Sequence, residues 1–109
     1  MTHVLHLAVE PFNKIKNGQK TIEMRLFDEQ KSKIKINDEI IFYYEENNIR
    51  CVVTDVKVYK NFDELYSNND KNLLGYSDDE IADPNDMLTY YPKEKQDKYQ
   101  VMAIFIKTI

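Results

Sequence analysis

The C-terminal stretch from Lys98 to Ile109 constrains the fold more than any other part of the sequence. Side chains of a strand alternate between the two faces of a sheet, and here both faces are mostly apolar. A strand with one solvated face would alternate apolar and polar residues instead. The stretch therefore predicts a strand that lies deep in a closed barrel.

Earlier segments also have the alternation and composition of strands. They are His3–Val9, the stretch from Lys20 to Leu26, Glu39–Tyr44 and Ile49–Tyr59. The last two are separated by the short polar connection 45–48, which predicts a hairpin.

Helical spacing is confined to the connections. Pro11 suits the first residue of a short helix that Gly18 ends, and Asn61 suits the cap of another. Residues 77–80 form a Ser-x-x-Glu capping box, which the proline at 84 limits to about one helical turn, and residues 85–91 predict a further helix. The pattern predicts an α+β chain, one domain over residues 1–109, whose sheet curls into a small β-barrel with short helices in the connections.

The stretch from Gly18 to Arg25 has a lysine, a glutamate and an arginine within six residues, which is unusual for a strand. Strict alternation places Thr21, Glu23 and Arg25 on one face and Lys20 on the other. A glycine before the strand lets the backbone turn, so we expect Lys20, Glu23 and Arg25 to converge on one cleft. The alternative is a solvated strand face with one Glu–Arg pair.

Written G-x-K-T-x-E-x-R, this stretch resembles the signature of the ASCH domain, a family with the PUA-like β-barrel fold. The likeness covers most of the chain, including His3–Leu7, Ile36–Phe42 and Tyr99–Ile104. In that family the motif lines a cleft for RNA or a nucleotide-like ligand. The resemblance implies a module that binds RNA, a nucleotide or a modified nucleoside through Lys20, Thr21, Glu23, Arg25 and the stacking aromatic Tyr91.

The resemblance also leaves a small hydrolase open. One related branch consists of amidohydrolases that act on acetylated cytidine with a lysine, a threonine and a glutamate; its lysine aligns with Lys20, but its threonine falls at Glu23. Other members are ribonucleases, in which a lysine and an arginine would stabilise a phosphorane while Glu23 moves a proton. If the chain is an enzyme, Lys20 and Glu23 are the expected catalytic residues.

Several site classes lack their residues. With only two glycines the chain has no phosphate-binding loop, and His3 and His6 fall on opposite strand faces, unsuited to sharing a metal. Cys51 is the single cysteine and is expected to be a buried core thiol. We therefore expect neither a metal nor a cofactor. The apolar runs are too short to cross a membrane and no signal pattern begins the sequence, which favours a cytoplasmic protein.

Charge is distributed unevenly along the chain, whose net charge is −4. Residues 10–36 carry seven cations against four anions, whereas residues 61–97 carry three cations against ten anions. A general nucleic-acid binder needs a basic surface, so RNA contact is expected only on the side of Lys14 to Lys35. The acidic 61–97 segment supports a third alternative, a protein-interaction domain.

Two positions predict unusual backbone. Asn37 and Gln100 stand where ASCH relatives commonly have glycine. Asparagine tolerates a left-handed conformation well and glutamine poorly, so we expect the start of the last strand to be affected.

Overall fold

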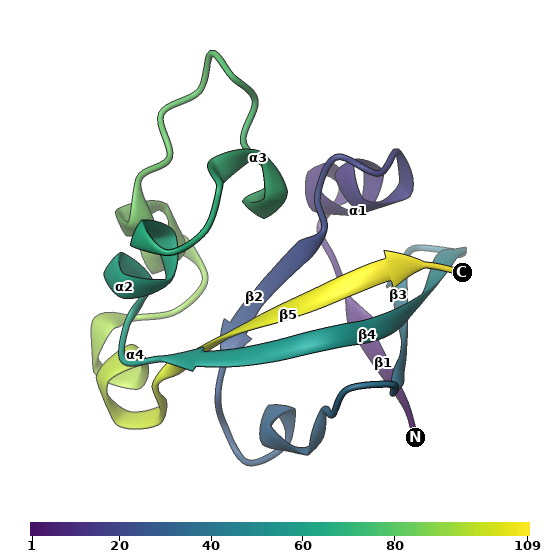
Figure 1. Ribbon diagram of the computed structural model, residues 1–109, viewed down its shortest axis with the longest axis horizontal. Helices are drawn as coiled ribbons and strands as arrows, with labels where there is room; N and C mark the ends of the chain where they lie inside the picture. The colour runs from purple at the N-terminus through teal and green to yellow at the C-terminus, as the bar shows by residue number, and fades with distance from the viewer.

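A computed structural model describes all residues from Met1 to Ile109. One five-stranded sheet, in the order β1-β3-β4-β5-β2, curls into a half-barrel (Figure 1). Its strands are β1 (Thr2–His6), β2 (Ile22–Leu26), β3 (Glu39–Tyr44), β4 (Asn47–Tyr59) and β5 (Val101–Thr108). The α+β class and the hairpin between β3 and β4 are confirmed, and β1 pairs with β3 in parallel.

Short helices occupy the connections between the strands. They are α1 (Val9–Lys16), η1 (Lys31–Lys33), α2 (Phe62–Ser67), α3 (Lys71–Leu74), η2 (Pro84–Thr89) and α4 (Lys93–Tyr99). The side chain of Asn61 caps α2 as predicted, because it accepts a hydrogen bond from the Glu64 amide at 2.9 Å. Figure 1 shows α2, α3 and α4 along one side of the sheet and α1 across from α3. None of the helices has the length and apolar character needed to cross a membrane.

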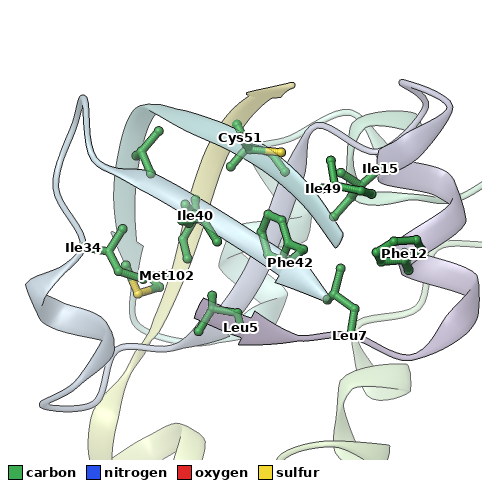
Figure 2. Packing of buried hydrophobic residues seen from close by; sticks show 13 residues of the cluster. Leu5, Leu7, Phe12, Ile15, Ile34, Ile40, Phe42, Ile49, Cys51 and Met102 are labelled. Atoms are coloured by element: carbon green, nitrogen blue, oxygen red, sulfur yellow. The ribbon is translucent and has the colours of Figure 1, made fainter. Parts of the chain in front are cut away.

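The strand β5 carries two hydrophobic clusters, one on each face. The first cluster fills the curl of the sheet, and Figure 2 shows Phe12 and Ile15 of α1 beside Phe42 and Ile49 within it. The second lies between β2, β5 and the helices α2, α3 and η2. Both faces of β5 are apolar because each face packs into one of the two clusters. Cys51 is fully buried in the first cluster, as expected, and burial raises the pKa of its thiol.

The predicted small β-barrel with short helices in the connections is confirmed as a curled half-barrel, but the sheet does not close. The two edge strands, β1 and β2, form no backbone ladder with each other, so the sheet stays open along this seam. The helix α1 connects the two edges in sequence, and the Arg25 guanidinium on β2 donates from Nη2 to the His6 carbonyl at the end of β1 at 2.9 Å. A side chain therefore bridges the seam where a ladder would otherwise close it.

Several boundaries also differ from the predictions. The first strand ends at His6 and the helix begins at Val9, because Leu7 turns inward to join the core. Residues 98 and 99 belong to α4 and not to the last strand, since the run that precedes them consists of good helix formers.

Differences also occur around residue 75. Residues 71–74 form the short helix α3, capped by Asp70. Glu80 accepts a hydrogen bond from the Ser77 amide at 2.8 Å, so half of the predicted capping box is present, yet no helix follows it. The helix predicted over residues 85–91 is the 3-10 helix η2.

The expectation for Asn37 and Gln100 is confirmed, since both have positive φ, 75° and 65°. Gln100 combines this φ with a ψ of −177°, a region that is essentially restricted to glycine. Its backbone is held there because its amide donates to Gln96 and its carbonyl accepts from Phe27.

Replacing Gln100 by glycine should therefore stabilise the protein by about 1 kcal/mol, since strain relief outweighs the added freedom of the unfolded chain. Chemical denaturation measures the free energy of unfolding. Asn37→Gly is the matched control and should change it by only a few tenths of a kcal/mol, because asparagine already tolerates its conformation. Equal effects at the two positions, or a loss of stability in Gln100→Gly, would contradict the assignment of strain.

Candidate functional site

A cleft of about 560 Å³ opens beside the edge strand β2. Its lining comes from the end of β1, from α1, from Lys20 and β2, from α2 and from the segment that runs from α3 to residue 91. The elements on its two sides are far apart in the sequence and meet here because α1 and α3 both adjoin the start of β2. The predicted residues Lys20, Glu23, Arg25 and Tyr91 all line this cleft.

The centre of the cleft is a buried ion cluster. The two carboxylate oxygens of Glu23 have different partners: Oε1 lies 3.3 Å from Lys20 Nζ, and Oε2 accepts from Arg25 Nε at 2.8 Å. Glu23 and Lys20 are almost fully buried, with 4% and 8% of their surface exposed. The structure thus brings Lys20, Glu23 and Arg25 together.

Lys20 joins this cluster because it precedes the strand. The strand β2 begins at Ile22, so strict alternation does not apply to Lys20, and Gly18 turns the backbone with a φ of 86°. The Lys20 amide donates to the Lys14 carbonyl at 3.0 Å, which fixes the chain against α1. Its ammonium group is then directed toward Glu23 and toward the Leu74 carbonyl, 3.3 Å away.

The ion cluster favours the charged forms of Glu23 and Arg25. Burial acts to raise the pKa of Glu23, but the charges of Lys20 and Arg25 outweigh burial and hold that pKa below its ordinary value. Burial acts to lower the pKa of Arg25, and Glu23 reverses this effect and raises it. An ionised Glu23 that accepts from two cations is a weak base, so the cluster is better suited to orienting hydrogen-bond donors than to moving protons.

Gly75 was not predicted as part of the site, although it closes the cluster on the side of α3. Its carbonyl accepts from Lys14 Nζ at 2.7 Å, and its backbone has a φ of 107°. A methyl group at this position would lie 3.2 Å from Lys20 Cδ, a tight approach. Glycine therefore lets the end of α3 pack directly on the lysine stem.

The acidic segment forms one wall of the cleft, which the sequence did not indicate. Glu80 and Asp86 line that wall, and Glu80 lies 3.8 Å from Lys14 Nζ. In total, three cationic side chains face four carboxylates in the lining, the four being Glu10, Glu23, Glu80 and Asp86. The cleft is therefore close to electrically balanced, in contrast to a phosphate-binding groove.

Tyrosines surround the cleft mouth. Tyr91 stacks on Phe62 with ring centroids 6.1 Å apart, while its neighbour Tyr90 is 60% exposed. Burial raises the pKa of Tyr91, and Arg25 partly opposes this effect. Tyr99 packs against the second core cluster and does not line the cleft.

Other predicted residues lie elsewhere. Thr21 does not line the cleft; its amide donates to Leu73 and its carbonyl accepts from Ile106, so it ties α3 to the sheet. The lysines at 31, 33 and 35 also lie outside the cleft, because η1 follows the far end of β2 (Figure 1). The single basic side predicted for residues 14–35 is therefore divided.

The two histidines have separate environments, and neither belongs to a metal cluster. His3 Nε2 lies 2.9 Å from Asp38 Oδ2, whereas His6 lines the cleft. No group of three His, Cys, Asp or Glu side chains is arranged to hold a metal ion.

The sequence and the fold of this chain both match known proteins. The ASCH-domain profile matches residues 5–109. The chain belongs to the ASCH-domain family. ASCH domains have a PUA-like fold, a fold that binds RNA. No curated protein matches the chain.

Solved structures agree with this family. The crystal structure of the hypothetical protein PH0355 is 29% identical with a TM-score of 0.86, and each chain covers 100% of the other. The solution structure of protein PF0455 from Pyrococcus furiosus is also 29% identical, with a TM-score of 0.73 and coverage of 100% of this chain and 98% of that one. The crystal structure of ASCH from Zymomonas mobilis is 16% identical, with a TM-score of 0.64 over 95% of this chain and 65% of that one; it supports the ASCH fold alone.

Replacing Glu23 by glutamine should lower the free energy of unfolding by about 2 to 4 kcal/mol at neutral pH, because Lys20 and Arg25 lose their buried partner. The pKa of Glu23 in the folded state lies below its ordinary value of 4.5, so its stabilisation is complete above that pH and declines below it. The difference between the wild type and Glu23→Gln should therefore shrink as the pH falls below about 4.5.

Denaturation series at several pH values measure this difference. Glu29→Gln is the control, since Glu29 is exposed and forms no ion pair; it should change stability by less than about 0.5 kcal/mol. A Glu23→Gln variant as stable as the wild type at neutral pH would show that the ion cluster does not stabilise this ASCH domain.

Proposed function

We propose that the cleft binds one nucleoside, either free or as an unpaired nucleotide of RNA, with its base directed toward Arg25. The observation that carries this proposal is the arrangement of the guanidinium. Its Nε donates to Glu23 and its Nη2 to His6, so two of its five N–H groups hold it in place and the others remain for a ligand or for Tyr91. A fixed donor fork of this kind suits the carbonyl and ring nitrogen acceptors of a base edge.

The size and aromatic lining of the cleft agree with this ligand. A volume of about 560 Å³ lies within the range of roughly 300 to 1,000 Å³ that small-molecule sites occupy. Tyr90 and Tyr91 stand at the cleft with ring centroids 6.5 Å apart. Unpaired bases stack on aromatic side chains, so the exposed ring of Tyr90 supplies a surface for a base or its neighbour.

The charge balance favours a nucleoside over a long stretch of phosphate backbone. Lys20 and Arg25 share the carboxylate of Glu23, and Lys14 lies near Glu80. Little positive charge is left for phosphates, whose binding depends on unpaired cations. If RNA is the source of the nucleoside, we expect one or two nucleotides to enter the cleft while the rest of the strand makes few contacts.

The alternative functions have less support. A hydrolase that uses Lys20 and Glu23 as base or nucleophile would need one of them unpaired, whereas each has the other within 3.3 Å. A protein-interaction surface on the acidic 61–97 segment would have to use the part of it that does not line the cleft.

Arg25→Gln should weaken nucleoside binding by about tenfold to a hundredfold, which corresponds to the loss of one or two charge-assisted hydrogen bonds. Calorimetric titration with cytidine, uridine, adenosine and guanosine measures this effect. Lys31→Gln removes a cation outside the cleft and should leave the affinity unchanged. Binding by Arg25→Gln as tight as by the wild type would contradict the proposal.

A salt titration with a short single-stranded RNA tests the charge argument in the same proteins. One or two phosphate contacts predict a slope of about −1 in log affinity against log salt. A slope steeper than about −3 would indicate a phosphate groove instead.

A further inference from the structure

A chain of hydrogen bonds runs along the acidic wall of the cleft, opposite the ion cluster. Tyr66 of α2 and Tyr76, which follows α3, have their hydroxyl oxygens 2.8 Å apart. The Tyr76 hydroxyl also donates to Asp86 Oδ2 of η2 at 2.9 Å. All three residues line the cleft, and none of them takes part in the ion cluster.

The direction of this chain follows from the number of hydrogens available. An ionised carboxylate only accepts, so the single hydroxyl hydrogen of Tyr76 is used on Asp86. Two oxygens 2.8 Å apart need a hydrogen between them, and only Tyr66 can supply it. Tyr66 therefore donates to Tyr76, and Tyr76 donates to Asp86.

Both phenols keep their hydrogens at neutral pH. Burial raises the pKa of Tyr66 above its ordinary value and raises that of Tyr76 further, with hydrogen bonding to Tyr66 and Asp86 acting in the same direction on Tyr76. With both hydrogens engaged, this three-residue chain offers only acceptors: lone pairs of Tyr66 and of the Asp86 carboxylate. The opposite wall presents the N–H groups of Lys20 and Arg25, which are donors.

We propose that this Tyr66–Tyr76–Asp86 chain makes the cleft select bases with an exocyclic amino group, cytosine and adenine, over the corresponding oxo bases. The inference rests on the proposed nucleoside function. An amino group donates to the acceptor wall, while the ring nitrogen or carbonyl beside it accepts from the donor wall. In uracil or hypoxanthine the exocyclic oxygen would face lone pairs instead, and an unmatched polar contact of this kind reduces affinity.

The pairs cytidine and uridine, and adenosine and inosine, differ at this group and at the protonation of the adjacent ring nitrogen, which makes them matched probes. Wild type should bind cytidine at least about tenfold more tightly than uridine, and adenosine more tightly than inosine. Tyr76→Phe frees the Tyr66 hydroxyl to donate, so it should bring the cytidine-to-uridine ratio close to one, chiefly by tightening uridine binding. Tyr66→Phe removes one of the two acceptors and leaves Asp86, so it should lower the ratio in part, by weakening cytidine binding alone.

Tyr59→Phe is the control, because its hydroxyl contacts Asn69 outside the cleft; it should keep the wild-type ratio. A purely structural role for the chain predicts that Tyr76→Phe weakens all four nucleosides equally, which would overturn the inference. A wild-type ratio near one with measurable binding would overturn it as well, while the nucleoside site would stand. Absence of binding by all four nucleosides to a folded wild type would refute both proposals.

Discussion

The rest of the cleft depends on the two ion pairs of the buried Glu23 carboxylate. A lone ionised carboxylate in this position would lose its hydration without compensation, so it requires cations at both oxygens. Lys20 and Arg25 supply them, and each then reaches a different element: Lys20 the end of α3, Arg25 the end of β1. One charged group thus connects the start of β2 to both sides of the open seam.

This arrangement explains why the sheet tolerates an open edge. Edge strands normally expose unpaired backbone groups that invite further pairing. Here α1 connects β1 to β2, and the Arg25 side chain donates a hydrogen bond to the His6 carbonyl. The cleft lies beside the gap between the two strands. The fold therefore places fixed hydrogen-bond donors beside unpaired strand edges.

The sequence correctly predicted features that are set by residues near one another in the chain. The two apolar faces of the last strand indicated its central place, and Gln100 at a glycine-like position indicated its strained backbone. The convergence of Lys20 with Glu23 was also expected, because Gly18 allows the turn before β2. These features depend on residues close together in the chain.

What was missed depends on contacts between distant segments. Lys20 and Gly75 are neighbours only because α3 packs against the start of β2, and no spacing rule connects them. Tyr66, Tyr76 and Asp86 share a hydrogen-bond chain although they come from α2, from the loop after α3 and from η2. The acidic segment supported only the alternative of a protein-interaction domain, whereas its contact with Lys14 became visible only in three dimensions.

We propose that ligands bind in the cleft beside β2. Amide chemical-shift mapping of the ¹⁵N-labelled chain during titration with cytidine tests it most directly. We expect saturable shifts at residues 23–25, 74–76 and 89–91, and none at η1 or at the hairpin of β3 and β4. Shifts centred on the lysines of η1, or a folded protein whose spectrum does not change, would contradict it.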